Sequence, residues 1–246
     1  MKKEIRGIVL AAGKGTRLKP YTKGKSKALL EIAPNVTIIE FIVDQLIKIG
    51  VDKITIAVRP EFLDQFKKKL GEKAKIVTVE SEEEFGNLYT LGTALKEVKE
   101  GRIVVVMSDH IFERKILERF IGYSGDKSIV LGLDRRPDKE KEMEGLKVKL
   151  NVESVKEVGK KLKKYEGIDV GIFLLTDESY PIIKEVLEIK GSGANLSDLV
   201  NHAVKRIGVG YVDITGGLWM DIDTINDLKK ARKLYWEIIE KNSLRD

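Results

Sequence analysis

A glycine-rich stretch near the N-terminus carries residues of the kind that bind phosphate groups. It begins where an apolar run from Ile5 ends, and its candidate nucleotide-binding residues are Leu10, Ala11, Ala12, Gly13, Gly15 and Thr16. Glycine and alanine let a backbone approach a ligand closely, so that N–H groups can face phosphate oxygens. Arg17 and Lys27 follow and add fixed positive charge, which makes them the candidate catalytic residues. Loss of either should slow a phosphate reaction by on the order of 10²-fold or more.

Two common phosphate-binding motifs differ from this stretch in their spacing. The dinucleotide fingerprint requires a third glycine where Leu18 stands, and no acidic residue follows a second strand at the right interval. Residues 24–26 match the end of a Walker A loop, but Lys19 occupies the position of its first glycine. A plain strand-to-helix turn is the remaining alternative, and such a turn would not require Arg17 and Lys27. The stretch therefore predicts a nucleotide-handling enzyme of another kind.

Three aspartates from distant parts of the sequence are candidate ligands for Mg²⁺. Asp109 follows directly on a buried strand, and Asp221 and Asp223 lie two residues apart, so extended backbone would turn them the same way. Mg²⁺ in a nucleotide site takes one or two carboxylates together with phosphate oxygens and waters. Asp223 could instead cap a helix that starts near Thr224, and both roles stay open for it.

Two other polar residues lie beside these candidates. Asn87 stands where a helix is expected to begin, and it could be an N-cap or could hydrogen-bond a nucleotide base. His110 should point away from Asp109 if the strand geometry continues, which favours an indirect role. The sequence has no cysteine and only two histidines, well separated, so a zinc site and serine–histidine chemistry are disfavoured.

Alternation of apolar segments predicts an α/β fold that positions these residues. Buried strands are predicted at 5–11, 54–58, 76–79, 103–107, 129–133 and 170–175. Helices are predicted at 38–49, 61–70, 88–98, 115–121, 180–187 and 224–241. This order indicates one domain, residues 1–246, with a mostly parallel sheet, helices on both of its faces, and ligands at the carboxyl ends of the strands.

The stretch 137–169 interrupts this alternation. Residues 147–150 and 154–158 alternate like antiparallel strands around a turn at Asn151. We interpret the stretch as a small antiparallel insertion that acts as a lid on the substrate site.

The composition of the chain limits which binding partners and which cellular location are expected. The 246 residues are 42% hydrophobic and 34% charged, a balance typical of a thermophile's globular protein. The net charge is +6, but basic and acidic residues are interleaved and no aromatic–basic stripe occurs, so nucleic acid is not an expected partner. Neither a membrane-length apolar run nor a signal peptide is found, which indicates a cytoplasmic protein. The sequence does not indicate an oligomeric state.

The pattern L-A-A-G-x-G-T-R followed by a lysine resembles the sugar-phosphate nucleotidylyltransferases. The resemblance implies the Rossmann-like fold of the nucleotide-diphospho-sugar transferase type. It also implies a reaction that joins a nucleoside triphosphate to a phosphorylated acceptor and releases pyrophosphate. That family usually has proline before the second lysine, whereas Ser26 precedes Lys27 here, so the segment that carries Lys27 is less stiff. The N-x-x-S/T-L form at 87–91 is similar to cytidylyltransferases and implies CTP, with Asn87, Thr90 and Ser108 in the nucleotide pocket.

Nearly the whole chain resembles the branch of that family that uses CTP and inositol-1-phosphate. The residues that carry this likeness are Ser108-Asp109-His110, Asp169-Val170-Gly171 and the stretch 219–224. The resemblance implies CDP-inositol and pyrophosphate as products, Mg²⁺ as cofactor, and a place in the synthesis of the compatible solute di-myo-inositol phosphate. Since the chain stops after this part, it also implies a separate membrane CDP-alcohol phosphotransferase as functional partner.

The same resemblance assigns an acceptor site. Asp169 and Gly171 are implied to lie near the acceptor hydroxyls, and Lys160 is the candidate for its phosphate. Other lysines are close enough in sequence to serve instead, namely Lys161, Lys163 and Lys164. We therefore expect one lysine of this cluster to reach the site.

Two alternative functions are considered. A hexose-1-phosphate or phosphocholine could replace inositol-1-phosphate, but phosphocholine would need an aromatic cage, and Tyr165 and Phe173 are few candidates for one. A nucleotide-sugar-sensing regulatory subunit would be expected to lack some of the charged residues that are present here, Arg17 and Asp109 among them.

Overall fold

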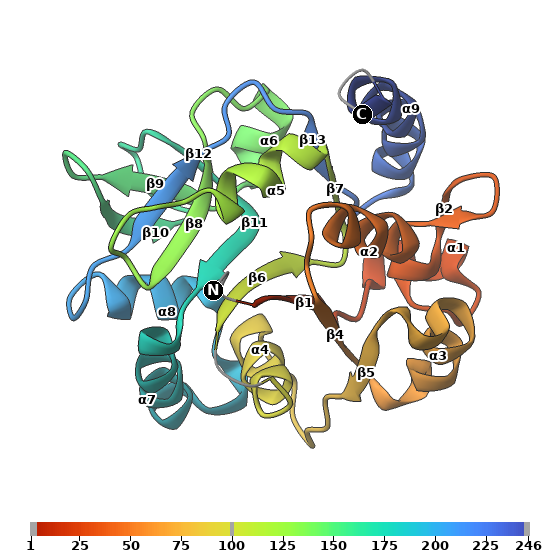
Figure 1. The fold of residues 1–246 in the computed structure, drawn as a ribbon, viewed down its shortest axis with the longest axis horizontal. Helices are drawn as coiled ribbons and strands as arrows, with labels where there is room; N and C mark the ends of the chain where they lie inside the picture. The colour runs from red at the N-terminus through yellow and green to blue at the C-terminus, as the bar shows by residue number, and fades with distance from the viewer. Residues whose placement is uncertain (1–3, 99–100, 244–246) are drawn as a thin grey trace.

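Parallel strands form the middle of the molecule (Figure 1). The structure is a computed structural model that describes residues 4–98 and 101–243. β1 (Ile5–Ala11) pairs in parallel with β4 (Lys53–Val58) on one side and β6 (Arg102–Met107) on the other, and β5 (Lys75–Thr78) continues beyond β4. All seven residues of β1 are buried, as expected for a central parallel strand covered on both faces.

Antiparallel strands extend the sheet beyond β6. β11 (Gly167–Leu175) runs antiparallel to β6, and β8 (Ile129–Asp134) pairs with the other edge of β11. β9 (Lys147–Leu150) and β10 (Val155–Gly159) form the predicted antiparallel hairpin, which joins the sheet at the start of β11. The insertion therefore contributes strands to the main sheet, and its closing motion stays a prediction.

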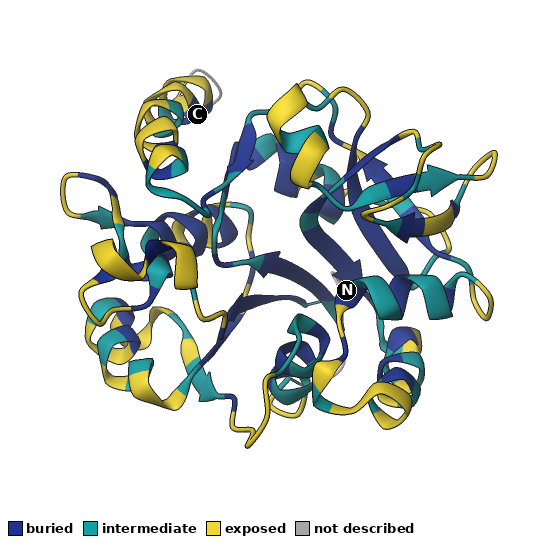
Figure 2. Ribbon diagram, turned by 180° about the vertical axis from the view of Figure 1, so that it is seen from behind, coloured by how far each residue is buried: buried dark blue, intermediate teal, exposed yellow. Residues whose placement is uncertain are grey.

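Helices cover both faces of the sheet, as predicted. Each face has its own apolar core, because successive side chains of β1 point to opposite sides: Val9 packs into one core and Ile8 into the other. The first core holds α2 (Ile38–Lys48), α3 (Leu63–Leu70), α5 (Arg114–Ile121) and α9 (Ile225–Ser243). The second holds α4 (Asn87–Leu95), α7 (Tyr180–Lys190) and α8 (Leu196–Ala203). Figure 2 shows the buried strands at the centre and exposed residues along the outer helices.

Several short elements have no counterpart in the predicted set. They are α1 (Lys19–Thr22), β2 (Glu31–Ala33), β3 (Val36–Thr37), β7 (His110–Phe112), α6 (Lys139–Glu144), β12 (Gly210–Asp213) and β13 (Trp219–Asp221). Most are four residues or fewer, too short for a hydrophobic period to be read. Among the residues that the structure describes, no helix is long and apolar enough to cross a membrane.

The pairing of β7 with β13 brings distant parts of the chain together. These two strands are antiparallel, with Asp221 opposite His110, and the N–H of Ile222 donates to the carbonyl of Asp109 over 2.8 Å. The end of β6 is thus fixed against the segment that leads into α9. Both groups of aspartates predicted from the sequence consequently lie at the carboxyl edge of the parallel strands.

Candidate active site

The loop after β1 has the open backbone that a phosphate-binding loop needs. Leu10, Ala11 and Ala12 are buried and anchor the start of the loop, whereas Gly13 and Thr16 are exposed. A Cβ on Gly13 would meet nothing within 4 Å, so this side of the backbone is open. Within the described part of the chain, the N–H groups of residues 13–16 donate no hydrogen bond. These groups are therefore available to an anionic ligand.

Gly15 has a specific structural reason to be glycine. Its φ of 56° lies in the left-handed region, and a Cβ there would stand only 3.2 Å from Cβ of Lys27. The glycine therefore lets the segment that carries Lys27 pack directly against the loop.

Lys27 lies between two carboxylates from distant parts of the chain. Its Nζ is 2.6 Å from Oδ2 of Asp109 and 2.9 Å from Oδ1 of Asp223. Burial lowers the pKa of Lys27, but the negative charges of Asp109 and Asp223 outweigh it and raise the pKa overall. Burial likewise disfavours the charged form of Asp109, yet Lys27 and His110 hold the pKa of Asp109 far below its usual range. The pair is thus fully charged at neutral pH.

Arg17 joins the same network from the exposed side. Its Nη2 donates to Oδ2 of Asp223 over 2.6 Å, and its Nη1 lies 3.5 Å from Oε2 of Glu144 at the end of α6. Asp223 therefore holds both candidate catalytic residues, one with each carboxylate oxygen. Glu144 was missed from the sequence, because nothing in its local pattern distinguishes it from the other glutamates of a charged helix.

The structure tests one of the two roles left open for Asp223, that of helix cap. The first turn of α9 is capped by Thr224 and Asp227: Oγ1 of Thr224 accepts from the N–H of Asp227 over 3.2 Å, and Oδ2 of Asp227 accepts from the N–H of Thr224 over 2.7 Å. The Asp223 carboxylate faces Arg17 and Lys27 instead. The helix-cap alternative for Asp223 is therefore wrong.

The predicted direction of His110 is also wrong. Ser108 and Asp109 form a turn between β6 and β7, so the alternation of a strand does not continue through them. Nδ1 of His110 lies 2.6 Å from Oδ1 of Asp109, and its ring stacks on Trp219 with an interplanar angle of 5°. Burial lowers the pKa of His110, but Asp109 and Asp221 more than compensate and raise it. His110 thus orients Asp109 and borders the cleft.

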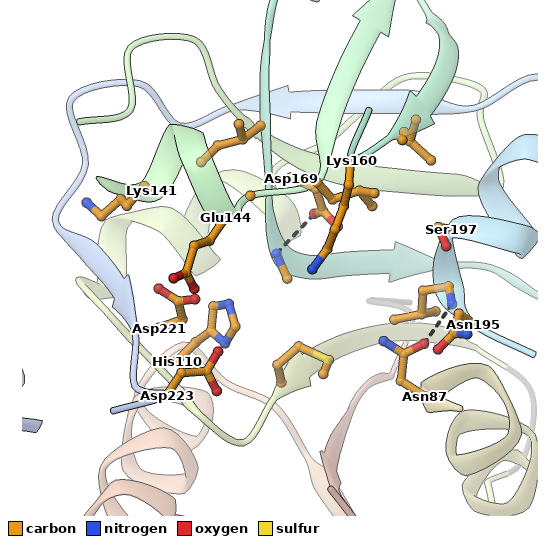
Figure 3. A pocket seen from close by; sticks show the side chains of 18 of the residues that line it. Asn87, His110, Lys141, Glu144, Lys160, Asp169, Asn195, Ser197, Asp221 and Asp223 are labelled. Carbon is orange, nitrogen blue, oxygen red and sulfur yellow. Dashed lines mark hydrogen bonds between the residues drawn. The ribbon is translucent and has the colours of Figure 1, made fainter. Parts of the chain in front are cut away.

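A cleft of about 730 Å³ opens beside this charged network. The predicted site residues that line it are Arg17, Asn87, Lys160, Asp169, Gly171, Asp221 and Asp223. Figure 3 labels all of these except Arg17 and Gly171. Lys27 and Asp109 do not line it but contact Asp223 and His110, which do. Thr90 and Ser108 are buried behind the cleft, and the hydroxyl of Thr90 donates to the carbonyl of Gly86 within α4.

The far end of the cleft is built where α4 and α8 begin. Gly86 packs against the carbonyl of Ala194, where any Cβ would stand 2.1 Å from the oxygen, so only glycine permits this approach. Oδ1 of Asn87 accepts from the N–H of Leu196 over 2.7 Å, which directs its amide nitrogen toward the cleft (Figure 3). Asn87 therefore offers a ligand a donor. Three further polar residues line the cleft from α8 and its N-cap, namely Asn195, Ser197 and Asn201; they were not predicted, because uncharged polar residues of a helix have no distinctive signal in the sequence.

Asp169 and Gly171 form one wall of the cleft, next to Lys160. The pairing of β11 with β8 shifts between Asp169 and Phe173, and Gly171 has a φ of 70° at this bulge. The N–H of Gly171 donates to Oδ1 of Asp169 over 3.0 Å, and a Cβ on Gly171 would stand 2.9 Å from Nε2 of His110. Among the four lysines of 160–164, Lys160 lines the cleft, and Figure 3 shows its amine pointing inward.

Asp169 should make stability depend on pH. Burial raises its pKa to about 7, and the hydrogen bond from Gly171 only partly opposes this. The folded chain therefore holds this proton up to about pH 7, whereas an unfolded aspartate releases it near pH 4, so unfolding free energy falls as pH rises through that window. Asp169→Asn cannot ionise and avoids the loss. Between pH 4.5 and pH 8, we expect the unfolding free energy of Asp169→Asn to rise by on the order of 2 kcal/mol relative to that of the wild type. This is less than the whole pKa difference would give, because the carboxylate borders water.

Denaturant unfolding of both proteins at the two pH values would measure this gain. Asp126→Asn is the control, since Asp126 is exposed and its pKa is lowered through Lys127 rather than raised. If the unfolding free energies of Asp169→Asn and the wild type differ by the same amount at both pH values, Asp169 does not titrate near neutrality.

The carboxylates around Lys27 also fit the ligands of a divalent cation. Oδ2 of Asp109 and Oδ1 of Asp223 converge on one positively charged nitrogen, and Mg²⁺ in nucleotide sites uses one or two carboxylates beside phosphate oxygens. Asp221 lines the cleft nearby. Across residues 4–98 and 101–243, no three histidine or carboxylate side chains gather to hold an ion by themselves. The carboxylates therefore fit an ion that also takes ligand oxygens from a phosphate group.

Taken together, these features define an α/β enzyme with a loop of backbone N–H groups, free among the described residues, at the carboxyl edge of a parallel sheet. The chain belongs to the nucleotidyl transferase family, whose family model matches residues 6–237. Members of this family generally use a divalent metal ion.

Known proteins similar to the chain agree with this family. A protein of Aquifex aeolicus named bifunctional IPC transferase and DIPP synthase is 34% identical over 229 residues, which cover 92% of this chain and 50% of the relative. A protein of the same name from Thermococcus kodakarensis is 32% identical over 93% of this chain and 50% of its own. The chain thus spans about half the length of these relatives. The solved inositol-1-phosphate CTP transferase from T. maritima has the same fold, with a TM-score of 0.84 at 23% identity over 97% of each chain.

Proposed function

We propose that the protein transfers the cytidylyl group of CTP to inositol-1-phosphate, giving CDP-inositol and pyrophosphate. The observation that carries the proposal is the convergence of Arg17, Lys27, Asp109 and Asp223 beside the glycine-rich loop, next to a cleft lined by polar and charged side chains. The names of the Aquifex and Thermococcus relatives support the choice of substrates. The chemistry of the cleft supports a polar, phosphorylated acceptor.

The residues account for the reaction by positioning and charge. An oxygen of the acceptor phosphate attacks the α-phosphorus of CTP; the bond from that phosphorus to the bridging oxygen breaks, and pyrophosphate leaves. The N–H groups of residues 13–16 bind the triphosphate, and Arg17 and Lys27 offset the charge that builds up on it. No protein nucleophile is needed.

Mg²⁺ is the cofactor we propose, held by Asp109 and Asp223 with Asp221 nearby. Bound there, it would neutralise phosphate charge and align the leaving group. For this to happen Lys27 must move from between the two carboxylates toward the phosphates. The negative phosphates toward which it moves would favour the charged ammonium in place of the two carboxylates.

The acceptor is assigned to the wall of the cleft formed by β11 and β10. The Asp169 carboxylate suits the hydroxyls of a cyclitol, and the Lys160 ammonium suits its phosphate. A hexose-1-phosphate would offer similar groups and is the alternative. Phosphocholine is disfavoured, because Tyr165 does not line the cleft and the ring of Trp219, which does, already stacks with His110 and has the ammonium of Lys141 4.8 Å from its centre.

We also propose a cellular location for the reaction and an enzyme that uses its product. We place the enzyme in the cytoplasm, where CTP is supplied. A membrane CDP-alcohol phosphotransferase is the partner that would consume CDP-inositol in making di-myo-inositol phosphate.

Pyrophosphate release tests the proposal directly. CTP, UTP, GTP, ATP and dTTP would each be combined with inositol-1-phosphate, glucose-1-phosphate, mannose-1-phosphate and phosphocholine, with Mg²⁺ at elevated temperature. Turnover with CTP and inositol-1-phosphate is expected to exceed every other pair. Turnover only with another pair would keep the mechanism and remove the inositol assignment, while nucleotide binding without turnover would favour a nucleotide-sugar-sensing regulatory subunit.

A further inference from the structure

Arg59 lies next to the phosphate-binding loop although it is far from that loop in sequence. It follows directly on β4, which pairs in parallel with β1 so that Val58 stands opposite Ala11. The loop begins one residue after Ala11. Arg59 is therefore at the same edge of the sheet as the loop, and neither the glycine pattern nor the carboxylates of the site mark it.

Arg59 makes two directed contacts there. Its Nε donates to the carbonyl oxygen of Ala12 over 2.9 Å. Its guanidinium lies over the ring of Phe85, 4.4 Å from the ring centre. Phe85 packs against Tyr89 and lies two residues before Asn87, at the far end of the cleft. Arg59 thus connects the phosphate-binding loop with the segment that leads into α4.

The first contact has a consequence for the loop. The carbonyl of Ala12 and the N–H of Gly13 belong to one planar trans peptide, so they point in opposite directions. When Arg59 holds the carbonyl, it fixes the direction of the Gly13 N–H, the first of the unpaired donors of the loop.

The charge of Arg59 is not neutralised by the protein. Within residues 4–98 and 101–243, no carboxylate lies at ion-pair distance from its guanidinium, and its hydrogen bond to Ala12 engages Nε only. By contrast, Arg17 and Lys27 are each paired with carboxylates. The terminal nitrogens of Arg59, Nη1 and Nη2, therefore keep their hydrogen-bond donors and their positive charge beside the loop.

We propose that Arg59 is a positioning residue for the nucleoside triphosphate: it sets the Gly13 N–H toward the phosphates and holds the Phe85 segment beside them. The inference rests on the proposed function, since it requires a triphosphate in this loop. It predicts a defect in nucleotide binding that is separate from acceptor binding.

Calorimetric titration with CTP and Mg²⁺, without acceptor, tests the inference. Arg59→Met is expected to weaken CTP binding by at least about tenfold, as for loss of one charge-assisted contact, while KM for the acceptor and the thermal midpoint stay close to wild type. Arg59→Lys, which keeps the charge and a donor, should recover part of the affinity. Phe85→Leu removes only the ring contact and should weaken binding by a few-fold.

Arg135 provides a matched control. Its Nε donates to the carboxylate of Asp213 over 2.7 Å and its guanidinium lies 5.4 Å from the ring centre of Tyr211, so it also combines an Nε hydrogen bond with a ring contact, but outside the cleft. Arg135→Met should leave CTP binding unchanged.

The results of these titrations distinguish a failure of the role of Arg59 from a failure of the proposed function. Equal CTP affinity in wild type and Arg59→Met, or a parallel rise in the acceptor KM, overturns the role of Arg59 alone. If the wild type binds none of the five nucleoside triphosphates, the proposed function itself fails and the inference fails with it. Should Arg59→Met not fold, Arg59→Lys and Phe85→Leu decide: unchanged affinity in both contradicts the role.

Discussion

Replacement of Lys27 by methionine is expected to lower kcat/KM for CTP by on the order of 10³-fold. Methionine keeps much of the length of the side chain but removes the charge that offsets the triphosphate. In the wild type, the carboxylates of Asp109 and Asp223 lie 2.6 and 2.9 Å from the lysine nitrogen. Without the ammonium, their negative charges would repel one another and the phosphates. Steady-state pyrophosphate release at varied CTP, with Mg²⁺ saturating, measures the effect.

Lys25→Met is the matched control for this change. Lys25 lies two residues away, is exposed, and lines a separate pocket on the surface of α3. The same loss of one positive charge should there change kcat/KM by less than about threefold, because exposed charges are well screened. If Lys27→Met keeps wild-type turnover at saturating CTP, Lys27 does not act on the reaction.

The sequence was sufficient to predict the parallel half of the fold. Strands that are buried on both faces, such as β1 and β6, are unbroken apolar runs, and amphipathic helices such as α2 have a clear period. The short pairing of β7 with β13 was not predictable, because three residues carry no period and their partners lie over a hundred residues apart. Yet this pairing brings Asp221 opposite His110 and so assembles the site.

The charged residues of the site were predictable by type but not by contact. The loop pattern and the strand end identified Arg17, Lys27 and Asp109, because phosphate chemistry restricts which residues can serve. Which carboxylate holds which cation depends on side-chain directions that turns alter, as at His110. Arg59 and Glu144 reach the site only through tertiary packing, from a strand end and a charged helix that are ordinary in sequence.

Replacement of Asp109 by asparagine should show whether the carboxylates serve a metal ion or only hold the basic residues. Asparagine preserves the shape and can still accept a hydrogen bond from His110 or Lys27, but it removes the charge that a divalent ion requires. We expect kcat to fall by on the order of 10²- to 10³-fold. We also expect the Mg²⁺ concentration for half-maximal rate to rise by at least about tenfold, as measured by Mg²⁺ titration at saturating CTP and acceptor.

The two readouts distinguish the roles of Asp109, because a residue that only orients Lys27 would change kcat without changing the Mg²⁺ dependence. Asp213→Asn is the control: Asp213 is also paired with a basic residue, with its Oδ2 2.7 Å from Nε of Arg135, but it lies outside the cleft. It should leave both quantities near wild type. A fall in kcat for Asp109→Asn with an unaltered Mg²⁺ requirement would move the metal to Asp221 and Asp223, which lie in the same segment on the other side of Lys27. The charges of Lys27 and His110, which hold the pKa of Asp109 far below its usual range despite its burial, would then make Asp109 a partner that only orients Lys27.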